Sequence, residues 1–201
     1  MIHMSISIER LDDLSAFIRT GRTFRAAPQS SAPDAIRVLS YKDLKGQRLL
    51  GRKEAAADGV LGQCDAVEAW AGEHLQPDDI LFAGKGGRSQ AYRFDLSERV
   101  IAGSLFVVIR TKADVLDPGY LLWFLNSTAT QAHFKASMVG TTVPNIPLTV
   151  LKELGVPLPP LERQRLIARV HQLAVQEEIL TNELLHQRRV LVEQTLANAT
   201  A

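Results

Sequence analysis

Apolar residues in the first part of the chain follow two different spacings. Residues 6–8 alternate apolar and polar side chains, which predicts a short strand, whereas 11–18 carries apolar residues at helical spacings until Gly21 interrupts them. Arginines and prolines punctuate 21–34, so we expect a basic loop there. The apolar residues of 36–39 predict a buried strand.

Turn-forming residues divide the middle of the chain into short segments. A polar loop reaches toward Trp70, and a turn at 76–79 then precedes the apolar strand 80–83. That strand stops at the glycine-rich segment 84–88, where the backbone can approach a ligand closely. The continuous apolar run of 104–110 is the strongest strand signal and is typical of a sheet covered on both faces.

Two helices are expected after this strand. Asp117 and Pro118 have the N-cap and first-turn chemistry that starts a helix, and 120–125 supplies a mostly apolar body. A second short helix is expected over 130–139. The glycine and prolines of 140–147 end it.

The final segment contains neither glycine nor proline after Pro160, and strong helix formers dominate 161–197. One helix of this length extends on the order of 55 Å at ~1.5 Å per residue, which is more than the preceding domain can cover. Spacings of four and three residues place six apolar residues on one seam, namely Leu166, Val170, Leu173, Leu180, Leu184 and Leu191. Glu177, Gln187 and Gln194 interrupt the seam. We expect a coiled coil that buries it against a partner, the alternative being a helix folded back on its own domain.

These elements predict an α/β (α+β) globular domain over 1–157, followed by one long C-terminal coiled-coil helix over 158–201. The composition, with 46% hydrophobic and 22% charged residues, is that of an ordinary soluble protein. No apolar run approaches the roughly 18 to 20 residues of a membrane span. The amino end lacks the features of a secretory signal, so we expect a cytoplasmic protein. The single Cys64 and five dispersed histidines predict neither an internal disulfide nor a metal site.

Positive charge is concentrated at the front of the chain. Residues 1–53 hold ten Lys and Arg against five Asp and Glu, although the net charge of the whole chain is only +1. A positive face on a near-neutral protein fits contact with a phosphate backbone over a limited patch. A solvated surface is an equally good interpretation of the charge alone.

The motifs of several enzyme classes are absent. The segment 84–87 lacks the spacing and the Ser or Thr of a Walker phosphate loop, and no Gly-x-Ser-x-Gly elbow occurs. Pro77 and Asp78 are followed by no acidic residue two positions before a lysine, as a metal-dependent nuclease of the PD-(D/E)xK type requires. The Asn/Asp-Pro-Pro-aromatic tetrapeptide of amino-methyltransferases is also missing. We therefore expect no catalytic residues in this chain.

Taken in order, these segments resemble the target-recognition domain and following helix of type I restriction-modification specificity subunits. The most specific part of the resemblance is a set of residues near the carboxyl end, namely Leu116-Asp117-Pro118-Gly119-Tyr120-Leu121, Phe124-Leu125-Asn126-Ser127, Gln131, Gly140, Ile146, Leu154-Gly155-Val156-Pro157-Leu158-Pro159-Pro160-Leu161-Glu162-Arg163-Gln164 and Ile167. Arg163 stands where the family often has glutamate.

The resemblance implies a half subunit, with one recognition domain and one spacer helix where such subunits usually carry two of each. It implies a non-catalytic protein that binds one half of a split double-stranded DNA target and docks DNA methyltransferase subunits, with a restriction/translocase subunit as a further possible partner. A homodimer through the terminal helix is expected. S-adenosylmethionine belongs to the partner methyltransferase, and no cofactor is expected in this chain. The alternative is a standalone DNA-binding regulator or defence-system adaptor that uses the same domain; a self-contained hydrolase has no positive support.

Candidate DNA contacts are basic, amide or small polar residues of the expected loops. Basic side chains meet phosphates, and the glycines beside several candidates permit close approach of the backbone. Arginine can also pair with guanine, and glutamine or asparagine with adenine. The candidates are Arg19, Arg22, Arg25, Lys42, Lys85, Arg88, Gln90, Thr141, Thr142 and Asn145, among which Arg88, Gln90 and Asn145 are the candidate base readers.

Overall fold

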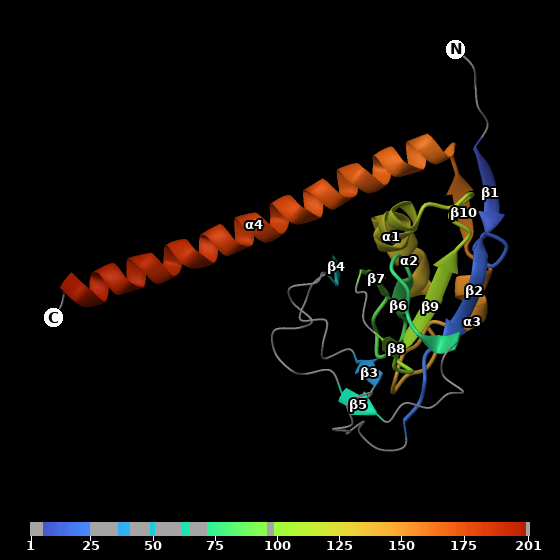
Figure 1. Ribbon diagram of the computed structural model, residues 1–201, viewed down its shortest axis with the longest axis horizontal. Coiled ribbons are helices and arrows are strands. Elements are labelled where there is room, and N and C mark those ends of the chain that lie inside the picture. The colour runs from blue at the N-terminus through green and yellow to red at the C-terminus, as the bar shows by residue number, and fades with distance from the viewer. Residues whose placement is uncertain are drawn as a thin grey trace, which may run out of the picture. The chain divides into compact units, whose positions relative to one another are not determined.

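The computed structural model describes residues 6–24, 36–40, 49–50, 62–64, 72–95 and 99–199. Two of the predicted DNA contacts, Arg25 and Lys42, lie outside these residues. The chain divides into two compact units, residues 1–168 and 169–201. A mixed α/β domain followed by one long helix confirms the predicted fold class (Figure 1).

The described residues form ten strands in three sheets. The strands are Ser7–Arg10 (β1), Ser15–Thr20 (β2), Ile36–Leu39 (β3), Leu49–Leu50 (β4), Gly62–Cys64 (β5), Ile80–Ala83 (β6), Gln90–Phe94 (β7), Val100–Ala102 (β8), Phe106–Thr111 (β9) and Gly155–Leu158 (β10). A five-stranded sheet has the order β2-β9-β6-β7-β4, a three-stranded sheet has the order β5-β3-β8, and β1 pairs with β10. Neighbouring strands are antiparallel, except that β4 is parallel to β7 and β3 is parallel to β8.

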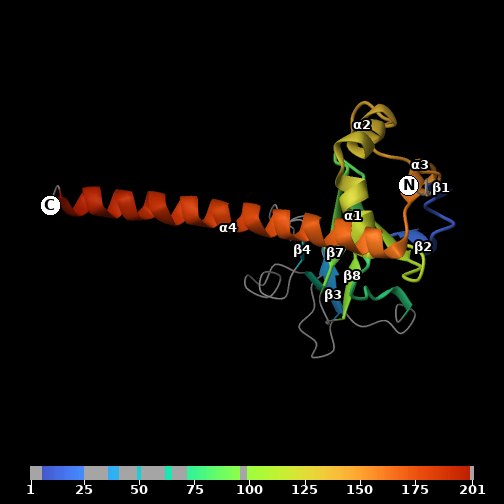
Figure 2. The same cartoon turned by 90° about the horizontal axis from the view of Figure 1, so that it is seen from above.

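The five-stranded sheet is the centre of the domain, and it is covered on both faces. Phe82 and Ile109 point to one face and pack with Leu121 of the first helix. Leu81 and Val108 point to the other face and pack with residues of β3 and β8. Figure 2 shows α2 (Thr128–Ala136) and β3 on opposite sides of this sheet. Burial on both faces explains why β6 and β9 are continuous apolar runs in the sequence.

Four helices occur in the described residues: Pro118–Asn126 (α1), Thr128–Ala136 (α2), Leu148–Lys152 (α3) and Leu161–Ala199 (α4). The predicted cap of α1 is confirmed, because the Asp117 side chain accepts a hydrogen bond from the Tyr120 amide and Pro118 lies in the first turn. The helix expected over 130–139 is present as α2, which begins and ends earlier than predicted. The Ser127 side chain caps it.

Four predicted strands are confirmed with small shifts. β1, β3, β6 and β9 occupy the segments in which the sequence predicts strands, and β9 begins and ends later than expected. The long loop expected before Trp70 is partly wrong, because it contains β4 and β5. Each of these two strands is too short to produce a period of two in the sequence.

The short helix predicted over 11–18 is wrong. Leu11 and Leu14 are buried in a turn, and β2 follows it and pairs with β9. A β-bulge between Ser15 and Phe17 interrupts the alternation of the strand. The apolar residues therefore fall at helical spacings although the backbone is extended, and pairing with β9 decides the conformation.

The long terminal helix is confirmed as α4, which has 39 residues. Its first two turns belong to the compact unit of residues 1–168, in which Gln164 is 1% exposed. The Gln164 amide nitrogen donates to the carbonyls of Val115 and Pro159, at 3.0 and 2.9 Å. Its amide oxygen accepts from the backbone of Asp117, at 2.9 Å. Among the described residues, no helix is long and apolar enough to cross a membrane.

Candidate nucleic-acid interface

The topology of the five-stranded sheet brings several sequence-distant loops to one edge. Thr20 at the end of β2 lies opposite Val107 near the start of β9, and Ala83 at the end of β6 lies opposite Phe106. Ala83 also lies opposite Gln90, the first residue of β7. Three loops meet here, and we call them the loop edge: residues 84–89, 103–105 and 139–147.

Backbone hydrogen bonds join the first and third of these loops. The amides of Gly86 and Gly87 donate to the carbonyl of Pro144, at 2.9 and 3.1 Å. The Ile146 amide donates to the carbonyl of Gly84, at 2.8 Å. Gly86 and Gly87 have φ values of 72° and 75°, a backbone conformation that disfavours other residues, so glycine is needed where the loops join.

Five of the predicted DNA contacts lie on these two joined loops. The backbones of Lys85 and Asn145 form an isolated antiparallel β-bridge, and Asn145 also exchanges backbone hydrogen bonds with Val139. Thr141 and Thr142 are exposed at the tip of the 139–147 loop, which Gly140 turns with φ 93°. Arg88 is exposed beside the paired glycines. The loop edge therefore combines cationic groups, hydroxyls and glycines with positive φ on a small area.

The ammonium group of Lys85 is held in place by the third loop. It donates a 2.7 Å hydrogen bond to the carbonyl of Ser104 in the turn before β9. The neighbouring Leu105 is 43% exposed, and Val143 on the opposing loop is 61% exposed. Neither side chain is a predicted DNA contact, because Leu105 belongs to the apolar run 104–110 that predicts a buried strand, and Val143 is a single apolar residue in a loop and gives no periodic signal.

Gln90 lies at the loop edge with an ordered side chain. Its amide oxygen accepts a 2.8 Å hydrogen bond from the hydroxyl of Tyr92. The backbone on both sides of Gln90 is held by side-chain amides of the α1–α2 corner: Asn126 bonds both backbone groups of Ala91, and Gln131 bonds Ser89. The carboxyl-end motif identified in the sequence therefore supports the loop edge.

The sequence profile described as "Type I restriction modification DNA specificity domain" matches residues 9–186. The chain belongs to this family. A curated relative, the type I restriction enzyme MjaVIII specificity subunit of Methanocaldococcus jannaschii, is 30% identical over 96 residues, which are 48% of this chain and 22% of that protein.

Solved structures of type I systems have a similar fold. The S subunit from M. genitalium matches with a TM-score of 0.53 and 19% identity, over 90% of this chain and 42% of that chain. The HsdS subunit from Thermoanaerobacter tengcongensis matches with a TM-score of 0.61 and 16% identity, over 90% and 40%. A chain from a structure on assembly and conformational transition of the type I restriction-modification system matches with a TM-score of 0.62 and 19% identity, over 90% and 45%. This specificity-domain chain thus spans less than half the length of each.

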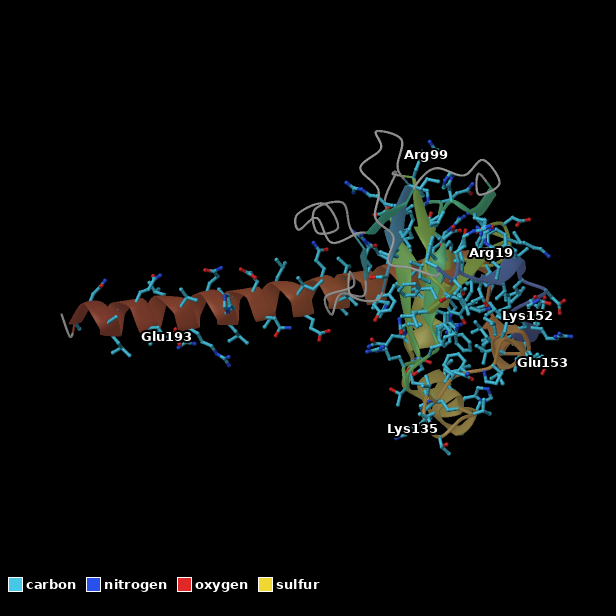
Figure 3. The ribbon with its side chains drawn as sticks, turned by 90° about the horizontal axis from the view of Figure 1, so that it is seen from below. Arg19, Arg99, Lys135, Lys152, Glu153 and Glu193 are labelled. Atoms are coloured by element: carbon cyan, nitrogen blue, oxygen red, sulfur yellow. The ribbon has the colours of Figure 1, made fainter. Side chains whose placement is uncertain are left out.

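Two further candidate contacts of the specificity domain are engaged within the protein. Arg22 forms a bidentate ion pair with Glu73, at 2.6 and 2.7 Å. Arg19 donates to the carbonyl of Gly72 at 3.1 Å, and its guanidinium lies 4.7 Å from the ring centre of Phe17. Figure 3 shows Arg19 on the side of the domain that also carries Lys152 and Glu153. Arg19 thus links β2, and Arg22 links the residues that follow β2, to the segment before β6.

A buried ion pair that the sequence did not indicate lies next to this segment. Asp79 is 1% exposed and accepts two 2.7 Å hydrogen bonds from the guanidinium of Arg110. Arg110 also lies 4.7 Å from the ring centre of Phe17. Close by, burial lowers the pKa of His74, and the positive charge of Arg99 lowers it further. In the described part of the chain, no group of three His, Cys, Asp or Glu side chains could hold a metal ion.

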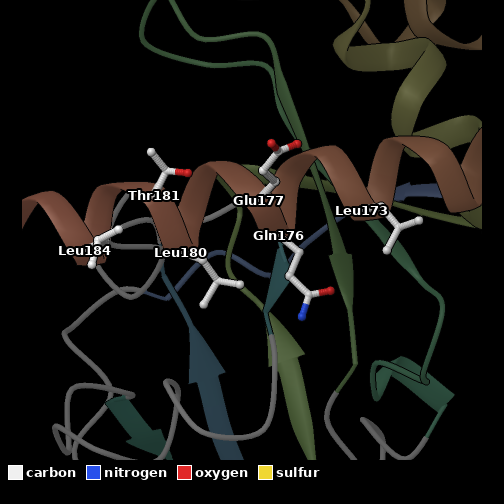
Figure 4. A pocket seen from close by; sticks show the side chains of 6 residues that line it. All are labelled: Leu173, Gln176, Glu177, Leu180, Thr181 and Leu184. Carbon is white, nitrogen blue, oxygen red and sulfur yellow. The ribbon is translucent and has the colours of Figure 1, made fainter.

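The six apolar residues predicted for the seam of the long terminal helix are exposed on α4. Their exposed fractions lie between 48% for Leu173 and 69% for Leu184. In Figure 4, the side chains of Leu173 and Leu180 point to the same side of the helix, whereas Glu177 and Thr181 point away from them. Leu173, Leu180 and Leu184 line one shallow hollow together with Gln176, Glu177 and Thr181. The helix thus presents an apolar stripe of the kind that the sequence predicts.

Proposed function

We propose that this chain binds one half of a split double-stranded DNA target through its loop edge, and that it acts without catalytic residues of its own. Membership in the DNA specificity family supports the ligand class. The observation that carries the placement is the junction of the 84–89 and 139–147 loops, which gathers Lys85, Arg88 and Thr142. Cations and hydroxyls of this kind contact phosphates, which set the register of a protein on a duplex.

We propose a role for each of the two segments that the sequence predicts. Residues 1–157 form the recognition domain, and residues 158–201 form the helix through which two copies dimerise. Methyltransferase subunits, which bring S-adenosylmethionine, dock on the assembled dimer, and a restriction/translocase subunit is a further partner. The similarity to specificity subunits of type I systems supports this assignment.

The proposed DNA contact is tested by a matched pair of charge reversals, Lys85→Glu and Lys112→Glu. The two ammonium groups make the same local contact, a 2.7 Å hydrogen bond to a backbone carbonyl, from Ser104 and from Asp13 respectively. Lys85 lies at the loop edge, whereas Lys112 follows β9 at the opposite edge of the sheet.

Binding of the full chain to duplex DNA is measured over a range of salt concentrations. We expect Lys85→Glu to weaken binding to all sequences and to make the negative slope of log K against log salt shallower by about 1. We expect Lys112→Glu to leave both quantities close to those of the wild type. Equal effects of the two reversals would place the DNA elsewhere on the domain.

A further inference from the structure

We propose that Gln90 reads a base, that its amide pairs with the major-groove edge of an adenine, and that Tyr92 is the positioning residue that orients this amide. The inference rests on the proposed function, because it assigns one specificity-determining contact within the proposed DNA interface. The glutamine amide and the major-groove edge of adenine carry complementary hydrogen-bonding groups. The amide oxygen of glutamine accepts from the adenine N6 amino group while its amide nitrogen donates to N7.

Gln90 is placed to reach a ligand at the loop edge. It is the first residue of β7, it is exposed, and it lies opposite Ala83, after which the 84–89 loop begins. Arg88 and Lys85, which we assign to DNA contacts, lie on that loop. A duplex bound by these cations therefore passes close to the Gln90 side chain.

The orientation of the Gln90 amide is fixed by a buried group. The Tyr92 hydroxyl donates to Oε1 of Gln90 at 2.8 Å, and the Tyr92 side chain is 2% exposed. Residues two apart on a strand point to the same face, so Tyr92 lies directly behind Gln90. The tyrosine ring packs in the core with Phe94 and Phe106, and its hydroxyl is therefore a fixed point.

In the structure the amide oxygen of Gln90 faces the Tyr92 hydroxyl, and this hydrogen bond leaves the pairing capacity of the amide for DNA intact. The carbonyl oxygen retains a second lone pair, and both N–H groups of Nε2 remain donors. Gln90 therefore presents an acceptor and a donor side by side, the pattern complementary to adenine N6 and N7. A side chain oriented before binding loses less conformational freedom when it binds.

The backbone beneath Gln90 is fixed by the α1–α2 corner. Asn126 accepts from the Ala91 amide at 3.0 Å and donates to the Ala91 carbonyl at 2.9 Å, as a neighbouring strand would. Gln131 bonds the hydroxyl and carbonyl of Ser89, and it also donates to the Leu125 carbonyl at 2.7 Å. Both residues flanking Gln90 are thus held, and the reading side chain stands on a rigid support.

The inference is tested by selecting binding sites from randomised duplex DNA with the full chain and its variants. We expect the wild type to prefer adenine at one position of each half-site. Gln90→Ala is expected to lower that preference roughly tenfold or more, the effect of losing one bidentate pair. Gln90→Glu is expected to change the preference to cytosine, because a carboxylate accepts from the N4 amino group but donates to nothing.

The control variant is Gln76→Glu, which makes the same change in an exposed residue at the opposite edge of the sheet, in the turn before β6. We expect it to keep the wild-type site. Tyr92→Phe removes only the hydroxyl. A positioning role predicts a several-fold weaker preference at the one adenine, whereas a merely structural role would weaken binding to all sequences equally.

The outcomes test the role of Gln90, the role of Tyr92 and the proposed function separately. If the wild type selects a site and both Gln90 variants select the same site with unchanged preferences, Gln90 is not a base reader and the proposed DNA-binding function stands. If Tyr92→Phe keeps the full preference for adenine, the positioning role of Tyr92 is wrong. If the wild type enriches no sequence, the proposed function fails and the assignment of Gln90 fails with it.

Discussion

At the scale of single residues, three side-chain amides form hydrogen bonds with backbone groups that are satisfied elsewhere by a neighbouring strand or helical turn. Asn126 pairs with the backbone of β7, Gln131 bonds the segment that precedes that strand, and Gln164 bonds two backbone groups before α1 and one before α4. Buried backbone groups without partners are costly, so these amides replace neighbours that the sheet and the helices do not supply. The recognition domain is therefore sensitive at positions that lie outside its apolar core.

Replacement of Gln164 by alanine is expected to lower the free energy of unfolding by about 2 to 4 kcal/mol, because it leaves buried backbone groups at Val115, Asp117 and Pro159 without partners. The measurement is denaturation by urea. Gln176→Ala, on an exposed turn of the same helix, is the matched control and is expected to change stability by less than about 0.5 kcal/mol. Equal stability of the two variants would contradict the role of Gln164.

The sequence identifies some of these residues but not what they do. Asn126, Gln131 and Gln164 all belong to the motif that carries the family resemblance, yet each of them also bonds a partner that lies 35 to 49 positions away along the chain. Arg22 illustrates the same limit, because it is attractive as a phosphate contact until the fold brings Glu73 to it. Positive charge in a loop does not indicate whether a protein carboxylate already binds it.

At the scale of elements, predictions are best where local chemistry decides the conformation. The N-cap residue and the first-turn proline of α1 are recognisable in the sequence, and α4 has a long run of helix formers without glycine or proline. Both helices could therefore be predicted. β2 could not be predicted, because pairing with β9 and a bulge override the spacing of its apolar residues. β7 depends on pairing with β6 and on contacts from α1, which lie far from it in sequence.

Gly119 lies where α1 closely approaches the first turns of α4. A Cβ atom added at Gly119 would lie 2.8 Å from the Cβ of Ala168. Gly119→Ala is therefore expected to destabilise the domain by about 1 to 3 kcal/mol through overpacking, although alanine favours a helix over glycine by roughly 1 kcal/mol. Denaturation of the single and double variants measures the effect.

The partner substitution Ala168→Gly makes this test specific. The double variant is expected to recover part of the stability that Gly119→Ala loses, because removal of one methyl group makes room for the other. Purely additive effects of the two substitutions would mean that the two Cβ positions do not compete for the same space.

At the scale of the whole molecule, the apolar stripe of α4 predicts a dimer of this chain. We expect Leu184→Glu to shift the protein to monomers in light scattering, because it places a charge within the paired seam. Asn182→Glu adds the same charge to an exposed residue of α4 outside the seam and is expected to leave the dimer intact. A Leu184→Glu variant that remained fully dimeric would place the interface outside the seam.

The central claim is that two copies of this domain read two halves of one target, and the spacing of those halves tests it most directly. Two identical domains related by a twofold axis bind identical half-sites in opposite orientation. The measurement is selection of bound DNA with the methyltransferase partner present, followed by affinity for the selected site with one to five inserted base pairs. We expect a split palindrome whose affinity falls when the gap changes length and stays nearly constant when only the bases of the gap change. Recovery of one continuous asymmetric site, insensitive to insertions, would contradict the account.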